Sequence, residues 1–554
     1  MTEYTISDYL LDVIKALGAD EILGVPGDYN LQFLDHITHR DDMKWVGNAN
    51  ELNASYMADG YAREKGFATF VTTFGVGELS AINGLAGSVA EHVPVLEIVG
   101  APTNDVQNAG KLVHHTFGDS NFDRFIQAHE ALGIKTTVLD AKHAIDQIDE
   151  TLAYIHTTKQ PAYLVLPSDL VNALVNPALQ GGIANRIAAK QEQNVDQSVA
   201  AISAALADSK SPVIVVGHEV DRFSLGQAVK DFSLKNNIPV VDLGLGKGAV
   251  DESFANFVGT YNGTISDEEI NQFVSGADTV LVLGAKLTDS VTGGFTQEFD
   301  DSQVINLFAA AGSIYGQSLP ADYDFVATLQ QLASTDLNLK LANVQAPAGD
   351  ITALKATDKA LTQAFYDRAL QEFITADKTL VAEQGTSFFG LASQNLASGA
   401  KFFGQPLWGS IGYAFPATIG AQLANPSRRA VLSTGEGSLQ LTIQDFGLAL
   451  KERLTPVLFI IENTGYTVER VIHGMDEPYN DVPKYRYNKI AEAFGGQADQ
   501  YDFIEVSTEQ ELMDAMQKAD QESDKMVIIQ ANMAMKDAPA QLIETGIRFE
   551  AQNH

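Results

Sequence analysis

The residue of this sequence best placed for chemistry is Glu436, an acidic side chain between Gly435 and Gly437. The mostly apolar run 430–434 before it predicts a buried parallel strand, and the glycines predict a tight turn where that strand ends. A helix is predicted over 439–450. We therefore expect the carboxylate at a strand-to-helix turn, at the edge of a sheet where ligands bind.

A second turn supplies further oxygen atoms. Asn463 and Gly465 follow the run 456–461, which predicts another parallel strand ending at the same edge. A carboxylate, an amide oxygen and a glycine carbonyl suit Mg²⁺, which binds few protein ligands and completes its octahedron with phosphate oxygens and water. Taken alone, the pattern fits either a metal site or an ordinary strand-to-helix turn.

Length and composition limit the class of protein that must position these residues. The chain has 554 residues, too many for one core, so about three domains are expected. With 45% hydrophobic and 19% charged residues it has the composition of a soluble globular protein. No apolar run approaches the roughly 18 residues that span a bilayer. The start, 1–18, has the pattern of an amphipathic helix and no secretion signal, so we expect a cytoplasmic protein without a membrane partner.

Charge and cysteine content exclude other classes. The formal net charge of -35 makes nucleic acid an unsuitable partner, because phosphate contacts need clustered Lys and Arg. The absence of cysteine excludes disulfides, thiolate metal sites and a cysteine nucleophile, and it agrees with a reducing compartment.

Strands and helices alternate in three blocks, 1–180, 199–342 and 360–554, joined by polar connectors over 180–198 and 343–359. Alternation of this kind predicts an α/β fold of three doubly wound parallel sheets. The middle block has no G-x-G-x-x-G between a strand and a helix, so it does not predict a dinucleotide site. The predicted strands are 22–25, 69–73, 95–99, 162–166, 212–216, 239–243, 279–283, 379–382, 430–433, 457–461 and 526–530.

Five further residues carry groups suited to proton transfer. Asp28 ends the first predicted strand, Glu51 enters a helix, His114 and His115 are adjacent, and Glu469 opens a helix after the second turn. Each has an ordinary alternative. Carboxylates are common in the first turn of a helix, where they balance its dipole, and single histidines are mostly surface or capping residues.

Together these motifs resemble the thiamine diphosphate-dependent 2-oxo acid decarboxylases, which include pyruvate, indolepyruvate and branched-chain 2-oxo acid decarboxylases. The resemblance covers essentially the whole chain. It implies that 1–180 is a pyrimidine-binding domain, 199–342 a middle domain, and 360–554 a diphosphate- and metal-binding domain with a C-terminal helix. The implied cofactors are thiamine diphosphate and Mg²⁺.

The resemblance also implies roles for the proton-transfer groups. Glu51 would hydrogen-bond the pyrimidine ring and promote the imino tautomer that deprotonates the thiazolium. Asp28, His114 and His115 would form a proton-relay cluster, which suits histidine because its pKa lies near operating pH. Glu469 would lie over the reacting carbon, where it would handle departure of the carboxylate and protonation of the enamine. The implied reaction converts a 2-oxo acid into an aldehyde and carbon dioxide through a thiazolium ylide and an enamine.

Cofactor contacts follow from the same resemblance. Ile411 would be the apolar wedge that bends the cofactor, and the Gly409 carbonyl would accept a hydrogen bond from its 4′-amino group. The implied metal ligands are Glu436, Asn463 and Gly465, and the other implied contacts are Thr386, Gly435, Gly437, Ser438, Tyr466, Thr467 and Val468. The implied substrate pocket contains Gln384, Phe388, Val468, Thr545 and Phe549, together with the segment 290–292.

Two stretches depart from the family pattern: the metal turn at Glu436, and the segment usually written N-N-D-G-Y, which here runs from Glu462 to Tyr466 with Thr464 in place of Asp. Glu436 stands where the family usually has Asp, one methylene shorter, so the sequence predicts that Glu436→Asp would not reduce activity. Glu462, beside the metal turn, adds a carboxylate that we expect to point away. The longer side chain and the extra charge are compatible with weaker binding of metal and cofactor.

Substrate and assembly are the least specified properties. Val468 and Thr545 are modest in volume, which favours a branched-chain or aromatic 2-oxo acid over pyruvate. The alternatives are a pyruvate decarboxylase of fermentative metabolism and a cofactor-binding relative that has lost catalysis. The family further implies a homodimer or homotetramer with the active site at the subunit interface.

Overall fold

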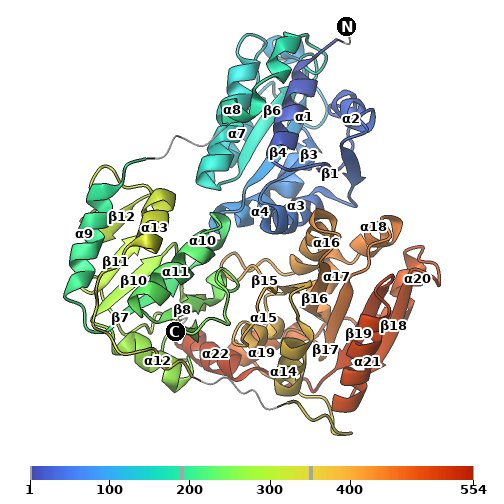
Figure 1. Ribbon diagram of the computed structural model, residues 1–554. Coiled ribbons are helices and arrows are strands. Elements are labelled where there is room, and N and C mark those ends of the chain that lie inside the picture. The colour runs from blue at the N-terminus through green and yellow to red at the C-terminus, as the bar shows by residue number, and fades with distance from the viewer. Residues whose placement is uncertain (1–2, 188–192, 348–352, 553–554) are drawn as a thin grey trace. The chain divides into compact units, whose positions relative to one another are not determined.

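The computed structural model describes residues 3–187, 193–347 and 353–552 (Figure 1). It contains three β-sheets, each flanked by helices. The chain forms two compact units: the first comprises 1–190, 415–426 and 442–454, and the second comprises the remaining segments. The connectors predicted between the blocks fall partly outside the described residues, at 188–192 and 348–352, as do residues 1–2 and 553–554 of the first and third predicted domains.

The first sheet has six parallel strands in the order β2-β1-β3-β4-β6-β5. Every residue of β3, β4 and β6 is buried, whereas the edge strands β2 and β5 are partly exposed. This is the pattern expected of a sheet covered on both faces. The strands are β1 Glu21–Gly24, β2 Lys44–Gly47, β3 Ala68–Thr73, β4 Val95–Ala101, β5 Lys135–Val138 and β6 Ala162–Pro167. The helices are α1 Ile6–Ala16, α2 Leu31–Thr38, α3 Glu51–Lys65, α4 Val76–Ala90, α5 Asn104–Asn108, α6 Arg124–Ala131, α7 Ala144–Thr158 and α8 Ile183–Ile187.

The middle sheet has the order β13-β12-β11-β10-β7-β8-β9. Successive residues of β7 enter different hydrophobic clusters: Ile214 and Val216 belong to one, and Val213 and Val215 to the other. Both faces are therefore covered, as doubly wound topology requires. Beyond β11 the chain turns back on itself, so β12 and β13 add an antiparallel edge to the predicted parallel sheet. The strands are β7 Pro212–Val216, β8 Val240–Leu243, β9 Phe257–Tyr261, β10 Thr279–Leu283, β11 Val304–Leu307, β12 Gly312–Ile314 and β13 Gln317–Ser318. The helices are α9 Asp196–Ala207, α10 His218–Arg222, α11 Gly226–Asn236, α12 Glu268–Ser275 and α13 Phe325–Ser334.

The third sheet is parallel and has the order β15-β14-β16-β17-β19-β18. The strands are β14 Lys378–Ala382, β15 Lys401–Phe403, β16 Arg429–Gly435, β17 Val457–Glu462, β18 Tyr501–Val506 and β19 Met526–Asn532. The helices are α14 Gln363–Phe373, α15 Thr386–Leu391, α16 Ala414–Ala424, α17 Glu436–Thr442, α18 Asp445–Lys451, α19 Thr467–Ile472, α20 Ile490–Ala493, α21 Glu509–Gln521 and α22 Ala540–Gln552.

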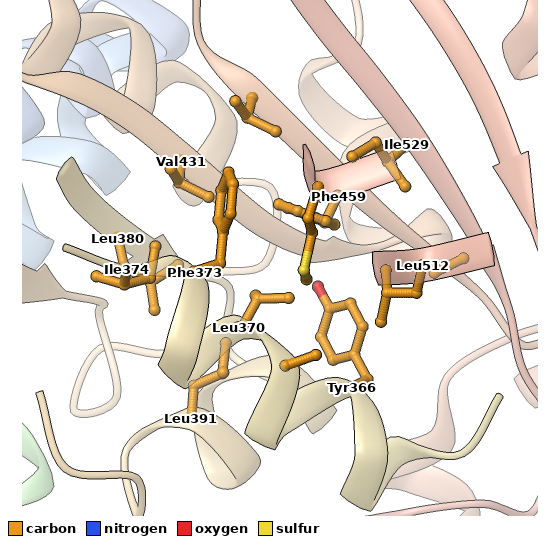
Figure 2. Packing of buried hydrophobic residues seen from close by; sticks show 14 of the residues in the cluster. Tyr366, Leu370, Phe373, Ile374, Leu380, Leu391, Val431, Phe459, Leu512 and Ile529 are labelled. Carbon is orange, nitrogen blue, oxygen red and sulfur yellow. The ribbon is translucent and has the colours of Figure 1, made fainter. Parts of the chain in front are cut away.

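One face of the third sheet is packed by α14. Figure 2 shows Tyr366 and Phe373 from this helix beside Phe459 of β17, with Leu512 of α21 completing the cluster. Phe459 meets both rings nearly edge-on, at centroid distances of 6.0 and 5.8 Å. The Tyr366 hydroxyl forms a hydrogen bond with Ser433 of β16 at 2.7 Å, so this buried polar group is paired.

The prediction of one continuous helix over 439–450 is wrong. The chain forms α17, which ends at Thr442, and α18, which begins at Asp445. The break contains Ile443, whose carbonyl accepts the N–H of Phe446 in a tight turn. Two adjacent β-branched residues, Thr442 and Ile443, favour helix less than their neighbours do, and periodicity alone did not reveal the break.

Within the described residues, no helix has the length and apolar character needed to cross a membrane.

Candidate active site

A cavity of about 410 Å³ lies beyond the carboxyl ends of β14, β16 and β17 in the second unit. The first turns of α15, α17 and α19 supply much of its wall. Backbone N–H groups in the first turn of a helix have no partner within the helix, so they attract anions such as a diphosphate. The lining residues are Glu383, Gln384, Gly385, Thr386, Ser387, Gly409, Ile411, Gly435, Gly437, Ser438, Asn463, Gly465, Tyr466, Thr467, Val468 and Glu469.

The predicted metal turn forms part of this wall. Gly435 ends β16, and Glu436 begins α17 with 1% of its surface exposed. Its Oε1 accepts the N–H of Gly465 at 2.6 Å. Among the described residues its Oε2 is buried without a hydrogen-bond partner. An unpartnered buried carboxylate oxygen beside Asn463 and Gly465 fits a divalent cation, which would satisfy it.

Glu462 affects this turn although it does not line the cavity. It is buried, and its charge helps to raise the pKa of Glu436 to about 7, after the larger effect of burial itself. The N–H groups of Gly465 and Asn463 oppose that shift. As expected from the sequence, Glu462 therefore does not line the cavity. Its charge nevertheless acts on Glu436 in the metal turn.

The second half of the metal turn has a strained backbone. Thr464 has φ +67, and Gly465 has φ +141 with a Cβ position only 2.1 Å from the carbonyl oxygen of Asn480. Only glycine fits there. The N–H of Tyr466 then donates to the same carbonyl of Asn480 at 2.9 Å. Beyond it, the fully buried Arg470 donates to the Met475 carbonyl at 3.1 Å, so the segment after α19 folds back onto the turn.

Tyr466 and Gly437 join the two halves of the turn. A Cβ on Gly437 would lie 2.6 Å from Cε1 of Tyr466, so the ring packs directly on this glycine. The hydroxyls of Ser438 and Thr467 belong to residues of the cavity wall, and that of Thr467 is buried without a partner among the described residues. These donors fit a diphosphate. Glu469, in the first turn of α19, lines the cavity and is exposed.

The predicted proton-relay cluster is assembled in the first unit. The Nε2 atom of His114 lies 2.7 Å from Oδ2 of Asp28, and the Nε2 of His115 lies 3.7 Å from its Oδ1. The ring of Tyr29 stacks on His114 at a centroid distance of 5.0 Å. The histidine loop is held closely: a Cβ on Gly75 would lie 2.0 Å from the carbonyl oxygen of His115. Asp28 thus contacts both histidines, His114 the more closely.

Glu51 is the first residue of α3 in the same unit. The helix is capped by Asn50, whose side chain accepts the N–H of Asn53 at 2.9 Å. A Cβ on Gly77 of α4 would lie 3.2 Å from Oε1 of Glu51, so the carboxylate extends over this glycine. The structure thus gives the Glu51 side chain a definite direction that a helix-capping role does not require.

The residues predicted to contact substrate do not all line the same cavity. Gln384 and Val468 line the main cavity. Phe388 lines a separate cavity of about 50 Å³ together with Ser290. Thr545 is buried and donates to the Gln541 carbonyl within α22, and neither it nor Phe549 lines either of these two cavities in the described structure.

Sequence reasoning missed three residues of this region. Glu383 and Ser387 line the cavity, and Arg470 braces the metal turn. Glu383 could have been found from the sequence, because its carboxylate directly follows a predicted buried strand. Glu436 became a candidate because it holds the same kind of position. Ser387 accepts a hydrogen bond from Ser433, which is distant in sequence, and Arg470 acts on carbonyls that the fold of its own loop brings to it.

The fold and the cavity define a thiamine diphosphate enzyme. Family models for thiamine pyrophosphate enzymes match the chain in three parts: the N-terminal TPP binding domain over residues 4–123, the central domain over 199–335, and the C-terminal TPP binding domain over 386–531. The two names denote the same cofactor.

Known relatives narrow this class. An alpha-keto-acid decarboxylase of Mycobacterium ulcerans is 37% identical over 544 residues, which cover 98% of this chain and 95% of the relative. One from Mycobacterium tuberculosis H37Rv is 38% identical over 550 residues, covering 97% and 95%. The chain belongs to the thiamine diphosphate-dependent 2-oxo acid decarboxylases, so the predicted family is confirmed. It is a carboxy-lyase of 2-oxo acids.

A solved structure has the same fold. The thiamine diphosphate-dependent 4-hydroxybenzoylformate decarboxylase of Rhodococcus jostii RHA1 superimposes with a TM-score of 0.78 at 20% identity. The match covers 97% of this chain and 100% of that one. At this identity the likeness concerns the fold alone, and it confirms the predicted α/β architecture.

Proposed function

We propose that this decarboxylase acts on branched-chain or aromatic 2-oxo acids, such as 4-methyl-2-oxopentanoate or phenylpyruvate. The observation that supports this is the cavity wall next to Glu469. Val468 adjoins Glu469 in this wall, Gln384 lines the same cavity, and in the described part of the chain Tyr466 is the only residue with a ring that lines it. A wall without bulky rings leaves space for a substrate side chain larger than methyl.

The proposed residue roles require thiamine diphosphate and Mg²⁺. When bound, the cofactor supplies the carbon that attacks the 2-oxo group and takes up the electrons released with carbon dioxide. Glu436, Asn463 and Gly465 would hold the metal. Ile411 and Gly409 would orient the rings from the cavity wall.

Proton movements fall to side chains of both units. Glu51 would hold the proton at the pyrimidine ring nitrogen, because a carboxyl group beside it can share that proton. Glu469 would assist departure of the carboxylate and then protonate the reacting carbon, and Asp28, His114 and His115 would relay protons and orient the substrate. An apolar wall such as Val468 would exclude water while carbon dioxide leaves.

We further propose a cytoplasmic homodimer or homotetramer in which the active site forms between subunits. Exposed apolar side chains in the first unit support self-association: Val76 and Leu79 on α4, with Leu112 and Phe117 near the histidines, are 55, 42, 70 and 68% exposed. The relay groups belong to the first unit and the metal turn to the second. Absence of cysteine agrees with the cytoplasm.

Substrate preference is tested by kcat/KM for pyruvate, 3-methyl-2-oxobutanoate, 4-methyl-2-oxopentanoate, phenylpyruvate and indolepyruvate, with cofactor and Mg²⁺ saturating. We expect the bulky acids to exceed pyruvate, and Val468→Phe to reverse that order. Pyruvate preference in the wild type would instead favour a fermentative pyruvate decarboxylase. No turnover of any acid would indicate a relative that has lost catalysis.

A mixing experiment tests the shared site. Glu51→Gln and Glu436→Ala subunits are combined, dissociated and reassociated. If each site takes Glu51 and Glu436 from different subunits, mixed dimers contain one intact site, and random mixing restores roughly one quarter of wild-type activity. A site built within one subunit would restore none.

A further inference from the structure

Glu383 is a buried carboxyl group to which the predicted site assigns no role. It directly follows β14, its residue surface is 1% exposed, and it lines the main cavity together with Gly409 and Ile411. A carboxyl group removed from water is costly unless hydrogen bonds compensate it. The partners of Glu383 therefore indicate its function.

Backbone N–H groups are those partners. Oε2 accepts the N–H of Ala414 at 3.2 Å, and Oε1 accepts that of Gln384 at 3.2 Å. The N–H of Gly412 also donates to the carboxyl group. Two of these three donors belong to the segment 409–414, which is distant from Glu383 in sequence. The side chain thus connects the end of β14 to that segment.

The segment 409–414 has a backbone path that requires anchoring. Gly409 has φ +65 and Gly412 has φ +88, so Ile411 stands between two left-handed residues. At the entrance, the N–H of Gly409 donates to the carbonyl of Gln405 at 2.9 Å. At the exit, Glu383 receives the N–H groups. Glycine has the largest conformational freedom to lose on ordering, so two glycines beside Ile411 would let it move without an anchor.

We propose that Glu383 is a positioning residue, whose carboxyl group holds the exit of the segment 409–414 so that Ile411 and Gly409 stay on the cavity wall where thiamine diphosphate binds. This rests on the predicted cofactor contacts of Gly409 and Ile411. Burial raises the pKa of Glu383 to about 8, although the N–H groups of Ala414, Gln384 and Gly412 lower it.

The decisive variant is Glu383→Gln, which keeps the size of the side chain. One oxygen becomes an NH₂ group that donates, so at least one backbone N–H loses its acceptor. We expect amide hydrogen exchange of 409–414 to accelerate about tenfold, and the Kd for thiamine diphosphate from calorimetry to rise about tenfold. The KM for the 2-oxo acid, measured at saturating cofactor, should change little while kcat falls.

Asp367→Asn is the matched control. Asp367 is another buried carboxyl group of the third domain with a raised pKa, it accepts a hydrogen bond from Gln363 at 2.8 Å, and it does not line the cavity in the described structure. Its loss should affect global stability without selective exchange in 409–414.

Several results would overturn the proposal: unchanged exchange in 409–414, exchange no faster there than in Asp367→Asn, or an unchanged cofactor Kd. If Glu383→Gln does not fold, Glu383→Asp withdraws the carboxyl group by one methylene and should show the same local loosening; normal exchange there would equally refute the anchor. A second variant separates the two parts of the proposal. Normal thiamine diphosphate binding by Ile411→Ala would refute the predicted contact between Ile411 and the cofactor, and with it the reason for holding the segment 409–414 in place. Amide hydrogen exchange in Glu383→Gln tests instead whether Glu383 holds that segment.

Discussion

The guanidinium of Arg470 donates a hydrogen bond to the carbonyl oxygen of Thr464 at 3.1 Å. Thr464 has φ +67, a conformation that costs a residue with a side chain on the order of 1 kcal/mol. The same guanidinium contacts Asp481 and the Met475 carbonyl. Arg470 therefore holds a strained turn between two predicted metal ligands, and it does so from a fully buried position.

Replacing Arg470 should loosen the metal turn. We expect Arg470→Met to weaken Mn²⁺ binding, followed by electron paramagnetic resonance with thiamine diphosphate present, by about 10- to 100-fold, as is usual when a residue that orients metal ligands is lost. Arg428→Met is the control, because Arg428 also joins backbone carbonyls, those of Ala376 and Gly399 at 2.8 Å, but does not line the cavity in the described structure. Equal metal affinity in the two variants would argue against this role.

Glu436→Asp tests whether the backbone fits the longer side chain. Sequence alone favoured no loss of activity, but Oε1 of Glu436 already reaches the N–H of Gly465 at 2.6 Å. An aspartate from the same backbone position is one methylene short of that contact. We now expect the variant to lose metal and cofactor faster. The measurement is activity after gel filtration, with and without added Mg²⁺ and thiamine diphosphate; equal retention would restore the sequence-based expectation.

Glu51→Gln should nearly abolish turnover and leave the fold intact. Loss of a group that exchanges protons in the reaction costs about 10²- to 10⁴-fold in kcat. The control is Glu64→Gln at the other end of α3, where Glu64 accepts a hydrogen bond from Asn425 at 3.0 Å. Circular dichroism and thermal unfolding should not distinguish the variants. Near-normal kcat in Glu51→Gln would contradict its proposed role.

Asp445 makes stability depend on pH. Burial raises its pKa from 3.8 to about 7, and the neighbouring polar side chain of Asn53 offsets part of this rise. The folded state therefore keeps a proton that the unfolded state releases above about pH 4, so stability is fully present below that pH and is lost as pH rises through 7. The contribution is on the order of a few kcal/mol.

The cofactor-free enzyme should accordingly show a Tm that falls between pH 5 and 8, with a smaller fall in Asp445→Asn, which stays neutral throughout. The pKa values of Glu78, Asp242 and Glu383 are shifted in the same direction, so part of the slope will remain. Identical slopes for the variant and the wild type would show that Asp445 does not contribute.

The sequence predicted most of the strands that lie inside the sheets, but not β11, which is short and lies between β10 and β12. β7 is a continuous apolar run and β17 is apolar from Val457 to Ile461, and such runs are recognised without tertiary information. The edge strand β5 is not, because its residues are exposed or half-buried and the segment, Lys135–Val138, carries little hydrophobic pattern. The antiparallel strands β12 and β13 are short and partly exposed, so they too carry little hydrophobic pattern and were not predicted.

For the site, sequence identified residues that carry a local signature. The glycines around Glu436 and the adjacent histidines are visible in a few consecutive letters. Glu383 and Arg470 are not, because their importance depends on backbone groups of Ala414 and Thr464 that the fold brings to them. The separation of Phe388 from the main cavity likewise depends on side-chain packing.

Close contact between α3 and α16 limits how this protein can be divided. A Cβ on Gly60 would lie 2.1 Å from the carbonyl oxygen of Ala417, and one on Gly420 would lie 2.0 Å from that of Met57. The segments 415–426 and 442–454 therefore interrupt the third domain in sequence while packing in the first unit. A fragment that consists of residues 360–554 would contain α16 but not α3, the helix against which α16 packs. Recombination between homologues, in the laboratory or in a genome, must exchange α3 and α16 together to preserve this glycine-lined crossing.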